Sequence, residues 1–435
     1  NDTVLDGFTV IGGKAPRSTG IYIVESSPTI RNCTISGGHP EHETVTWLWA
    51  YGIYCESSAA DLSDNTITGS ENPAAVETTG IFVKDGDDLM DISHNQVSAG
   101  VASDTCIGIE LIAGSETSIV RNTITVTAGE GAVGIHVQES TPELNGNTIT
   151  VGGATCADVI GIEFDRSSAW TNANAIVCGE ATNSTQGIFV GTASTPNIVG
   201  NSIFAGNATS YSRGIHVSAG SGYWVQVAGN YVHGGNAANA TGIRFGDVDG
   251  AIRNNVIYGG GPGCSVSVGI LLSSATPQIE NNTVCGGRAT WTCAIQSDGS
   301  SPPIINNILF TDGTGGQLAI LTSTPLDDAV MNNLFYDTGT MMHYSDDSVD
   351  ISDIVSLESH LGAEASDNLD GDPEFVDIDG PDDDIATLED NNWRLSGDTF
   401  PTITDDGYDL SASFSEDIES AERTVPWSIG AYEYD

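Results

Sequence analysis

Positive charge and long apolar segments are both scarce in this chain of 435 residues. Twelve Lys and Arg residues stand against 59 Asp and Glu residues, which gives a formal net charge of −47. Such a surface repels nucleic acid and anionic lipid, and it repels a polyanionic polysaccharide unless a cation bridges the two. No segment approaches the roughly 18 consecutive apolar residues that a membrane-spanning helix needs. Nucleic-acid binding and membrane insertion are therefore excluded as functions.

A signal peptide is also missing, because the residues from Asn1 onward already alternate like a strand, as in Val4–Val10. We expect a mature or trimmed product that lacks its upstream residues. The eight cysteines of this polar chain favour an oxidising compartment, outside the cell or on its surface. Three pairs have nearly the same separation and are candidate disulfides: Cys33 with Cys55, Cys156 with Cys178, and Cys264 with Cys285. Free cysteines in a packed core are the alternative.

A regular repeat is the main feature of the sequence. The dipeptide Gly-Ile recurs ten times between Gly20 and Gly269 and continues as Ala-Ile at Ala294 and Ala319, in steps of 25 to 32 residues. Each repeat contains a short alternating strand at Gly-Ile, a polar turn, a second strand that ends at Asn, and a third strand that ends near Gly-Gly. Three short strands per repeat describe one turn of a three-sided solenoid, and the regular period predicts about twelve stacked coils.

One asparagine recurs in phase with the second strand of each repeat. Asn tolerates a left-handed corner, and its amide can bond to the Asn of the neighbouring coil, so we expect a structural ladder. Its predicted members are Asn32, Asn65, Asn95, Asn122, Asn147, Asn174, Asn201, Asn230, Asn255, Asn282, Asn307 and Asn333.

The repeat resembles the right-handed parallel β-helix proteins of the pectate-lyase-like superfamily, whose coils carry strings such as residues 27–32, Ser-Pro-Thr-Ile-Arg-Asn. Residues 372–377, 392–396 and 429–434 are similar to a C-terminal module of bacterial surface β-helix proteins, although residues 400–407 depart from its usual Ser-Pro-Ala-Ile-Asp-Ala-Gly. The resemblance implies an all-β right-handed parallel β-helix over residues 1–337. An irregular linker over 338–369 and an acidic capping or docking domain over 370–435 complete the expected organisation.

Aromatic and charged residues mark the expected contact surface. The residue two places after each Gly points outward, so stacking should align Tyr22, Tyr54, Phe82, Glu110, His136, Glu163, Phe189, His216, Arg244 and Leu271 in a surface ladder. The longest corner loop, residues 39–51, adds Trp47, Trp49 and Tyr51. Such aromatic residues favour contact with sugar rings or another subunit, and a loop that packs on its own helix is the alternative.

Three residues of this ladder are weak catalytic candidates: Glu110, His136 and Glu163. The two glutamates lie two coils apart, about 9.6 Å at the backbone, near the upper limit for an inverting carboxylate pair. An ordinary solvated sheet face is the alternative. The resemblance implies that a lyase site would contain calcium-binding Asp residues and a basic residue. The basic residues of this chain are instead scattered in the sequence, which argues against such a site: Lys84, Arg121, Arg166, Arg213 and Arg244.

Two further motifs point to a cation and to sugars. Asp377, Asp379, Asp382 and Asp383 surround a Gly turn and could bind calcium, or they could form a solvated acidic turn. Asn183, Asn207 and Asn239 each begin an Asn-x-Thr sequon in the same corner loop and could carry glycans in a host that glycosylates Asn, or these could simply be polar loops.

These features favour a non-catalytic extracellular structural or adhesive protein that contacts polysaccharide or assembles with itself, end to end or side by side. Self-association is expected because an uncapped coil exposes strand edges. A polysaccharide lyase, a glycoside hydrolase or a carbohydrate-binding protein that uses the outward ladder is the rival hypothesis, so enzymatic activity stays open.

Overall fold

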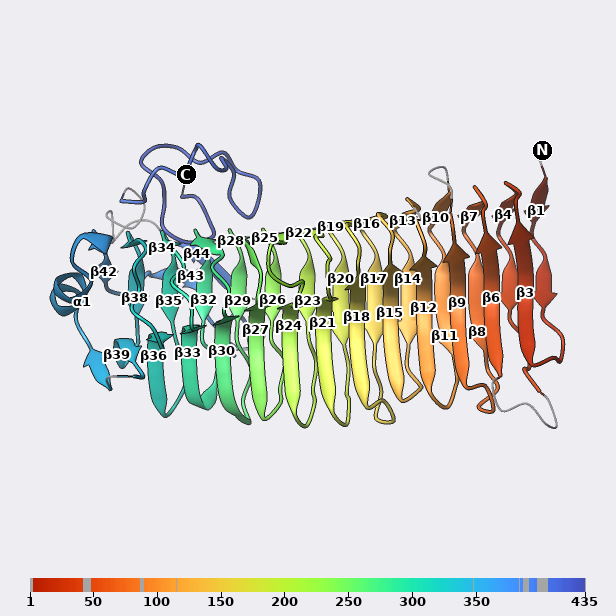
Figure 1. Cartoon of the computed structure of the whole chain (residues 1–435), viewed down its shortest axis with the longest axis horizontal. Helices are drawn as coiled ribbons and strands as arrows, with labels where there is room; N and C mark the ends of the chain where they lie inside the picture. Colours follow the sequence, from red (N-terminus) through yellow and green to blue (C-terminus); the bar gives the residue numbers. More distant parts are fainter. Residues whose placement is uncertain are drawn as a thin grey trace. The chain divides into compact units, whose positions relative to one another are not determined.

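A computed structural model describes residues 3–41, 48–86, 90–114, 116–346, 348–382, 384–385, 391–396 and 406–434. The chain divides into two compact units. The first unit comprises residues 1–197 and 205–209, and the second comprises residues 198–204 and 210–435. Each coil of either unit contributes one strand to each of three parallel sheets, which confirms the three-sided solenoid (Figure 1).

The first sheet contains the Gly-Ile strands. In the first unit these are β3 (Arg17–Val24), β6 (Trp49–Glu56), β9 (Glu77–Lys84), β12 (Thr105–Ile112), β15 (Gly131–Gln138), β18 (Asp158–Asp165) and β21 (Ser184–Val190). In the second unit they are β24 (Tyr211–Val217), β27 (Asn239–Gly246), β30 (Cys264–Ser273), β33 (Ala289–Asp298), β36 (Gly316–Thr322) and β39 (Thr340–Tyr344), with β40 (Val349–Ile351) antiparallel to β39.

The second sheet contains the strands that lead into the Asn. In the first unit these are β1 (Val4–Asp6), β4 (Thr29–Arg31), β7 (Asp61–Ser63), β10 (Asp91–Ser93), β13 (Ser118–Val120), β16 (Glu143–Asn145) and β19 (Trp170–Asn172). Strand β22 (Asn197–Val199) includes the boundary between the units. In the second unit they are β25 (Trp224–Ala228), β28 (Asp249–Arg253), β31 (Gln278–Glu280), β34 (Ile304–Ile305), β37 (Val330–Met331) and β41 (Ala365–Ser366).

The third sheet contains the strands that follow the Asn. In the first unit these are β2 (Thr9–Ile11), β5 (Thr34–Ser36), β8 (Thr66–Ser70), β11 (Gln96–Gly100), β14 (Thr123–Val126), β17 (Thr148–Val151) and β20 (Ala175–Cys178). In the second unit they are β23 (Ser202–Phe204), β26 (Tyr231–His233), β29 (Val256–Tyr258), β32 (Thr283–Cys285), β35 (Ile308–Phe310), β38 (Leu334–Tyr336) and β42 (Leu369–Asp370).

Close stacking of the coils explains the recurrent Gly of the first sheet. Neither Gly108 nor Gly134 has a left-handed backbone. A Cβ added to Gly108 would lie 2.5 Å from the carbonyl oxygen of Gly134, and the ladder pairs of β12 and β15 leave out both glycines. The neighbouring Ile109 and Ile135 are fully buried. Gly therefore allows each strand to bend against the next coil while Ile fills the core.

The Asn ladder forms inside the corner between the second and third sheets. In the first unit it runs from Asn65 to Asn174, with side-chain amide to carbonyl distances of 2.9 to 3.1 Å. In the second unit it runs from Asn201 to Asn368, with distances of 3.0 to 3.2 Å. The sequence prediction missed the last rung, Asn368, because its coil is longer than the others.

Two details of the predicted ladder are wrong. The left-handed corner residue is the one before each ladder Asn, such as Asp64 with φ 56° or His94 with φ 57°. Asn32 has φ 54° and is itself such a corner residue, and its amide donates to Asp6 at 2.9 Å. Cys33 therefore occupies the ladder position of that coil, where its backbone N–H donates to Asn65 Oδ1 at 3.0 Å.

Residues 338–369 are not an irregular linker. They contain β39, β40, helix α1 (Ile354–Leu361), a 3-10 turn at Gly362–Glu364, and β41, and their last residue begins β42. Strand β41 pairs with β37 and β42 pairs with β38, so this segment forms a further coil of the second unit. The sequence prediction ended the helix at 337 because this coil lacks the Gly-Ile pattern and carries a helix in place of a short turn.

The C-terminal segment packs along the side of the coils in the second unit. Its strands β43 (Phe375–Asp377) and β44 (Asn392–Leu395) lie beside the third sheet (Figure 1). Trp393, Ile429 and Tyr432 join a buried cluster with Tyr258 and Phe310 of that sheet, among others. The segment is thus part of the second unit, which corrects the prediction of a separate domain.

A buried arginine fixes this segment to the coils. Arg423 pairs with Glu433 at 3.2 Å, and both side chains are almost fully buried. The same guanidinium donates to Asn254 Oδ1 at 2.8 Å and to the carbonyl oxygen of Gly430 at 3.0 Å. The bond to Asn254 links the segment to the coils, and the Glu433 carboxylate balances the charge of the buried guanidinium that makes this bond.

Candidate functional site

The predicted outward ladder of the first sheet is confirmed within each unit. In the first unit, strand pairing places seven of its residues in one register: Tyr22, Tyr54, Phe82, Glu110, His136, Glu163 and Phe189. In the second unit, His216, Arg244 and Leu271 share one register. The first unit therefore presents an aromatic run followed by a patch of carboxyl and imidazole groups.

Three consecutive rings form the aromatic run of this ladder, and Phe189 lies beyond Glu163. Tyr22 stacks on Tyr54 and Tyr54 stacks on Phe82, each with ring centroids 4.9 Å apart. Tyr51 lies before the Gly bend but meets the same face, with its centroid 5.5 Å from Tyr54 and 5.2 Å from Phe82. Tyr22 is 63% exposed, whereas Phe82 and Tyr51 are buried at 9%. We call Tyr22, Tyr51, Tyr54 and Phe82 the aromatic platform.

The loop aromatics contribute less contact surface than predicted. Trp49 is half-buried and its ring lies 4.6 Å from the Arg17 guanidinium, and Tyr51 supports the platform from below. Trp47 lies outside the described residues. The exposed aromatic surface is therefore the Tyr22 end of the platform, because the bend at Gly52 folds Tyr51 against it.

Charged groups converge next to the platform. His136 Nδ1 lies 3.3 Å from Glu110 Oε1, and the two side chains are 19% and 13% exposed. The second oxygen of Glu110, Oε2, is buried and has no hydrogen-bond partner within the described residues. Glu163 follows His136 in the ladder. The predicted trio of Glu110, His136 and Glu163 is thus brought together.

Glu77 belongs to this cluster and was missed by sequence reasoning. Burial, together with the charges of Glu110 and Asp104, raises the pKa of Glu77. Glu77 lies three residues before its Gly, so it reaches the outer face only because the strand bends there. An alternating strand pattern does not reveal that bend.

The protonation of the cluster follows from burial and mutual charge. Burial raises the pKa of Glu163, which favours its neutral, proton-donating form. Burial disfavours the charged form of His136, but the hydrogen bond to Glu110 and the charges of Glu110 and Glu163 outweigh this and raise the pKa of His136. Asp165 is occupied elsewhere, because it pairs with Arg166 at 2.9 Å. The cluster therefore offers both proton donors and carboxylate acceptors.

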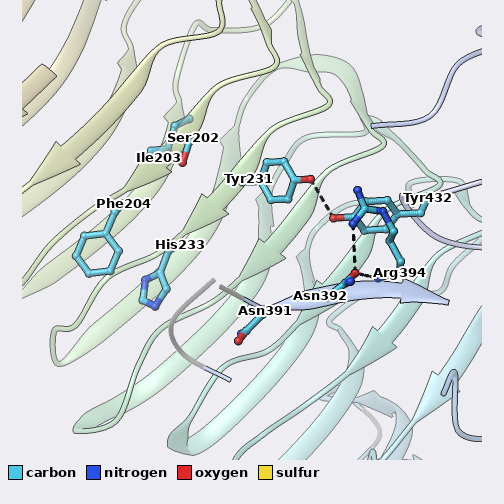
Figure 2. Close-up of a pocket in the computed structure, with 9 residues that line it drawn as sticks. All are labelled: Ser202, Ile203, Phe204, Tyr231, His233, Asn391, Asn392, Arg394 and Tyr432. Carbon is cyan, nitrogen blue, oxygen red and sulfur yellow. Dashed lines mark hydrogen bonds between the residues drawn. The ribbon is translucent and has the colours of Figure 1, made fainter. Parts of the chain in front are cut away.

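The second unit contains a pocket that the sequence did not predict. It has a volume of about 320 Å³ and lies between the third sheet and the C-terminal segment, where Phe204, Tyr231 and His233 face Arg394 and Tyr432 (Figure 2). Tyr231 Oη and Tyr432 Oη lie 3.0 Å apart. A sequence signal existed, since several outward residues of the third sheet are aromatic in the second unit, whereas none is aromatic in the third-sheet strands of the first unit.

The predicted disulfides are not formed, because all eight cysteines are free and buried. Cys33 lies at the corner between β4 and β5, whereas Cys55 is fully buried in β6 of the first sheet, so the two residues belong to different parts of the coil. The separations of the other two pairs, Cys156 with Cys178 and Cys264 with Cys285, also reflect the repeat. Burial raises the pKa of Cys55 and of Cys178 to about 12, which keeps these thiols protonated.

Calcium binding and glycosylation stay predictions. Asp377 accepts from the backbone N–H of Gly380 and Asp382 from that of Asp384, each at 3.0 Å, while Asp379 lies in the same turn and Asp383 lies outside the described residues. Within the described ranges, no group of three or more His, Cys, Asp or Glu side chains could hold a metal ion. Asn183, Asn207 and Asn239 are all exposed. The described part of the chain also contains no helix that is long and apolar enough to cross a membrane.

Comparison with known proteins agrees with this architecture. The family described as right handed beta helix region matches residues 19–222. This match and the three sheets of fourteen strands show that the chain has the right-handed parallel β-helix fold.

Several solved structures are similar to the chain, including a tailspike protein and XylC. The Dettilon tailspike protein is 13% identical, with 86% of this chain and 63% of that chain covered and a TM-score of 0.39. XylC in complex with xylose is 12% identical, with 96% and 67% covered and a TM-score of 0.36. The chain thus spans less than two thirds of the tailspike chain. No curated protein matches the sequence.

Proposed function

We propose that the chain is an extracellular adhesive protein that binds a neutral polysaccharide along the outward ladder of its first unit. The aromatic platform carries this proposal. Its rings repeat in register from coil to coil, as sugar rings repeat along a polysaccharide, and its Tyr22 end is open to solvent. Aromatic faces bind the apolar faces of sugar rings through burial and contact with polarised C–H groups.

The neighbouring cluster favours hydroxyl groups as its binding partners. Glu110 Oε2 is a buried acceptor without a partner among the described residues, and Glu77 and Glu163 lie on the same face. A sugar hydroxyl could donate to such an acceptor and offset the cost of its burial. The same carboxylates would repel a uronate or a sulfate ester, so the ligand of this face is a neutral glycan.

Hydrolysis of the bound glycan is a second candidate function. It is favoured by the raised pKa of Glu163, which lies next to His136, the partner of the Glu110 carboxylate. Glu163 would donate its proton to the leaving oxygen, while Glu110 accepts a proton from the water that attacks the anomeric carbon. Their separation of two coils, about 9.6 Å at the backbone, is near the upper limit for an inverting pair.

Binding measurements on matched variants test whether the aromatic platform binds a neutral glycan. We expect Tyr22→Ala to weaken binding of a neutral polysaccharide such as xylan or β-glucan about tenfold, because one stacked ring is lost. Trp170→Ala is the control, since Trp170 is also exposed but lies on the second sheet of the same unit. Absence of binding to every neutral glycan, or an equal loss in both variants, would contradict the proposal.

A reducing-sugar assay tests the hydrolytic candidate separately. If the wild type releases sugar, Glu163→Gln should abolish release while binding persists, because the amide still fills the site but cannot donate the acidic proton. Binding without release by the wild type would leave adhesion as the function and reject hydrolysis.

A further inference from the structure

Most cations of this acidic chain have a carboxylate partner. Eight of the twelve Lys and Arg residues form ion pairs: Lys14, Arg31, Lys84, Arg166, Arg253, Arg288, Arg394 and Arg423. Arg213 and Arg244 form none with the described residues, and they lie close together in the second unit. In a chain with 59 carboxylates, two adjacent unpaired arginines require an explanation.

The first sheet brings these two arginines and one histidine together. His216 of β24 and Arg244 of β27 are direct neighbours in the outward ladder. Arg213 lies three residues before His216, on the other side of the Gly214 bend, and its Nη1 lies 3.4 Å from His216 Nδ1. The ring of Tyr211 lies 4.8 Å from the Arg213 guanidinium and supports it. Residues that are scattered in the sequence thus form one cluster.

The cluster is desolvated and electrostatically unfavourable as it stands. Burial and the charge of Arg244 lower the pKa of Arg213 to about 10. Burial and the charges of both arginines lower the pKa of His216 to about 3. Arg244 Nε is buried and has no hydrogen-bond partner within the described residues. Buried like charges and an unused donor both cost free energy, and an anion would offset both costs.

We propose that Arg213, His216 and Arg244 form a binding site for one oxyanion group, a carboxylate, sulfate or phosphate. Two guanidinium groups supply planar sets of N–H donors that match the geometry of such anions. His216 accepts from Arg213, which fixes the orientation of that guanidinium. The site goes beyond the proposed function, which assigns a neutral glycan to the first unit, and neither depends on the other.

Calorimetry with defined anions tests the site. The probes are sodium sulfate, sodium phosphate and sodium glucuronate, with sodium chloride at equal ionic strength and glucose as controls. We expect at least one oxyanion to bind the wild type and to raise its melting temperature, because it binds the folded state alone. A preference for glucuronate indicates a sugar carboxylate, whereas equal or tighter binding of sulfate or phosphate indicates a free or esterified inorganic anion. No binding above the chloride control would overturn the proposal.

Variants separate a binding site from general screening. Arg213→Gln and Arg244→Gln should each weaken the anion at least about tenfold, because each removes charge-assisted hydrogen bonds. Arg121→Gln is the control, since Arg121 is exposed and has no ion pair among the described residues. Without anion, the two site variants should melt no lower than the wild type, because repulsion between the arginines is relieved. If Arg244→Gln does not fold, Arg244→Lys keeps the charge and should bind more weakly than the wild type. Equal binding by the wild type and all folded site variants would refute the site.

Discussion

The Asn ladder should carry a large share of the local stability of each coil, and Asn147→Ala tests this directly. Asn147 is fully buried in the first unit. Its Oδ1 accepts from the backbone N–H and the side-chain amide of Asn122, at 2.9 and 3.1 Å. Its Nδ2 donates to the carbonyl oxygen of Ile119 at 2.8 Å and to Asn174 Oδ1 at 2.9 Å. The substitution therefore removes four buried hydrogen bonds.

The magnitude follows from this count. At about 1 kcal/mol for each hydrogen bond, the loss is about 4 kcal/mol, and buried groups left without a partner would increase it. Asn145→Ala is the matched control in the same coil. Asn145 is half-buried and its amide makes one weak bond, 3.3 Å to Glu143, so its replacement should cost less than about 0.5 kcal/mol.

Urea unfolding followed by circular dichroism measures both changes, and hydrogen exchange at the Asn122 amide reports the coil itself. Because each coil of a solenoid contacts mainly its neighbours, exchange should accelerate most around the substituted coil. A loss below about 1.5 kcal/mol for Asn147→Ala, or equal losses for the two variants, would refute the view that the ladder stabilises the coils.

Three further predictions follow from the fold and the site. Gly134→Ala should destabilise the protein by about 2 kcal/mol or more, because the new Cβ would lie 2.4 Å from a backbone carbonyl oxygen of the next coil. Gly131→Ala is the control and should be nearly neutral, because its Cβ would lie 3.9 Å from the nearest atom. Urea unfolding measures both, and similar losses of stability would contradict the stacking argument. The pKa of His136 is raised above 6.5, so its pair with Glu110 stabilises the fold fully below about pH 6.5 and less as the pH rises through the folded-state pKa. Glu110→Gln should therefore flatten this part of the dependence of melting temperature on pH. An unchanged slope would count against the pair. All eight thiols should react with a thiol reagent after unfolding without reductant, and a count of six or fewer would show that disulfides do form.

The sequence by itself determined the solenoid, because a coil that stacks on its own copy must repeat the same residues at the same places. The Gly-Ile period predicted the three sheets, and the residue two places after each Gly predicted the register from Tyr22 to Phe189. The buried Asn recurred for the same reason, since each amide needs an identical partner one coil away.

Only the tertiary structure decided what the repeat does not encode. The bend of each first-sheet strand at its Gly brings Glu77 near Glu110 and Arg213 near Arg244. The alternating pattern of the strand does not predict which residues this bend places on the outer face. The C-terminal segment lies on the third sheet because Phe310 and Trp393 bury each other there, a contact between residues far apart in the sequence. Periodicity describes contacts between equivalent residues of successive coils, whereas the charge clusters and the pocket arise from contacts between unlike positions.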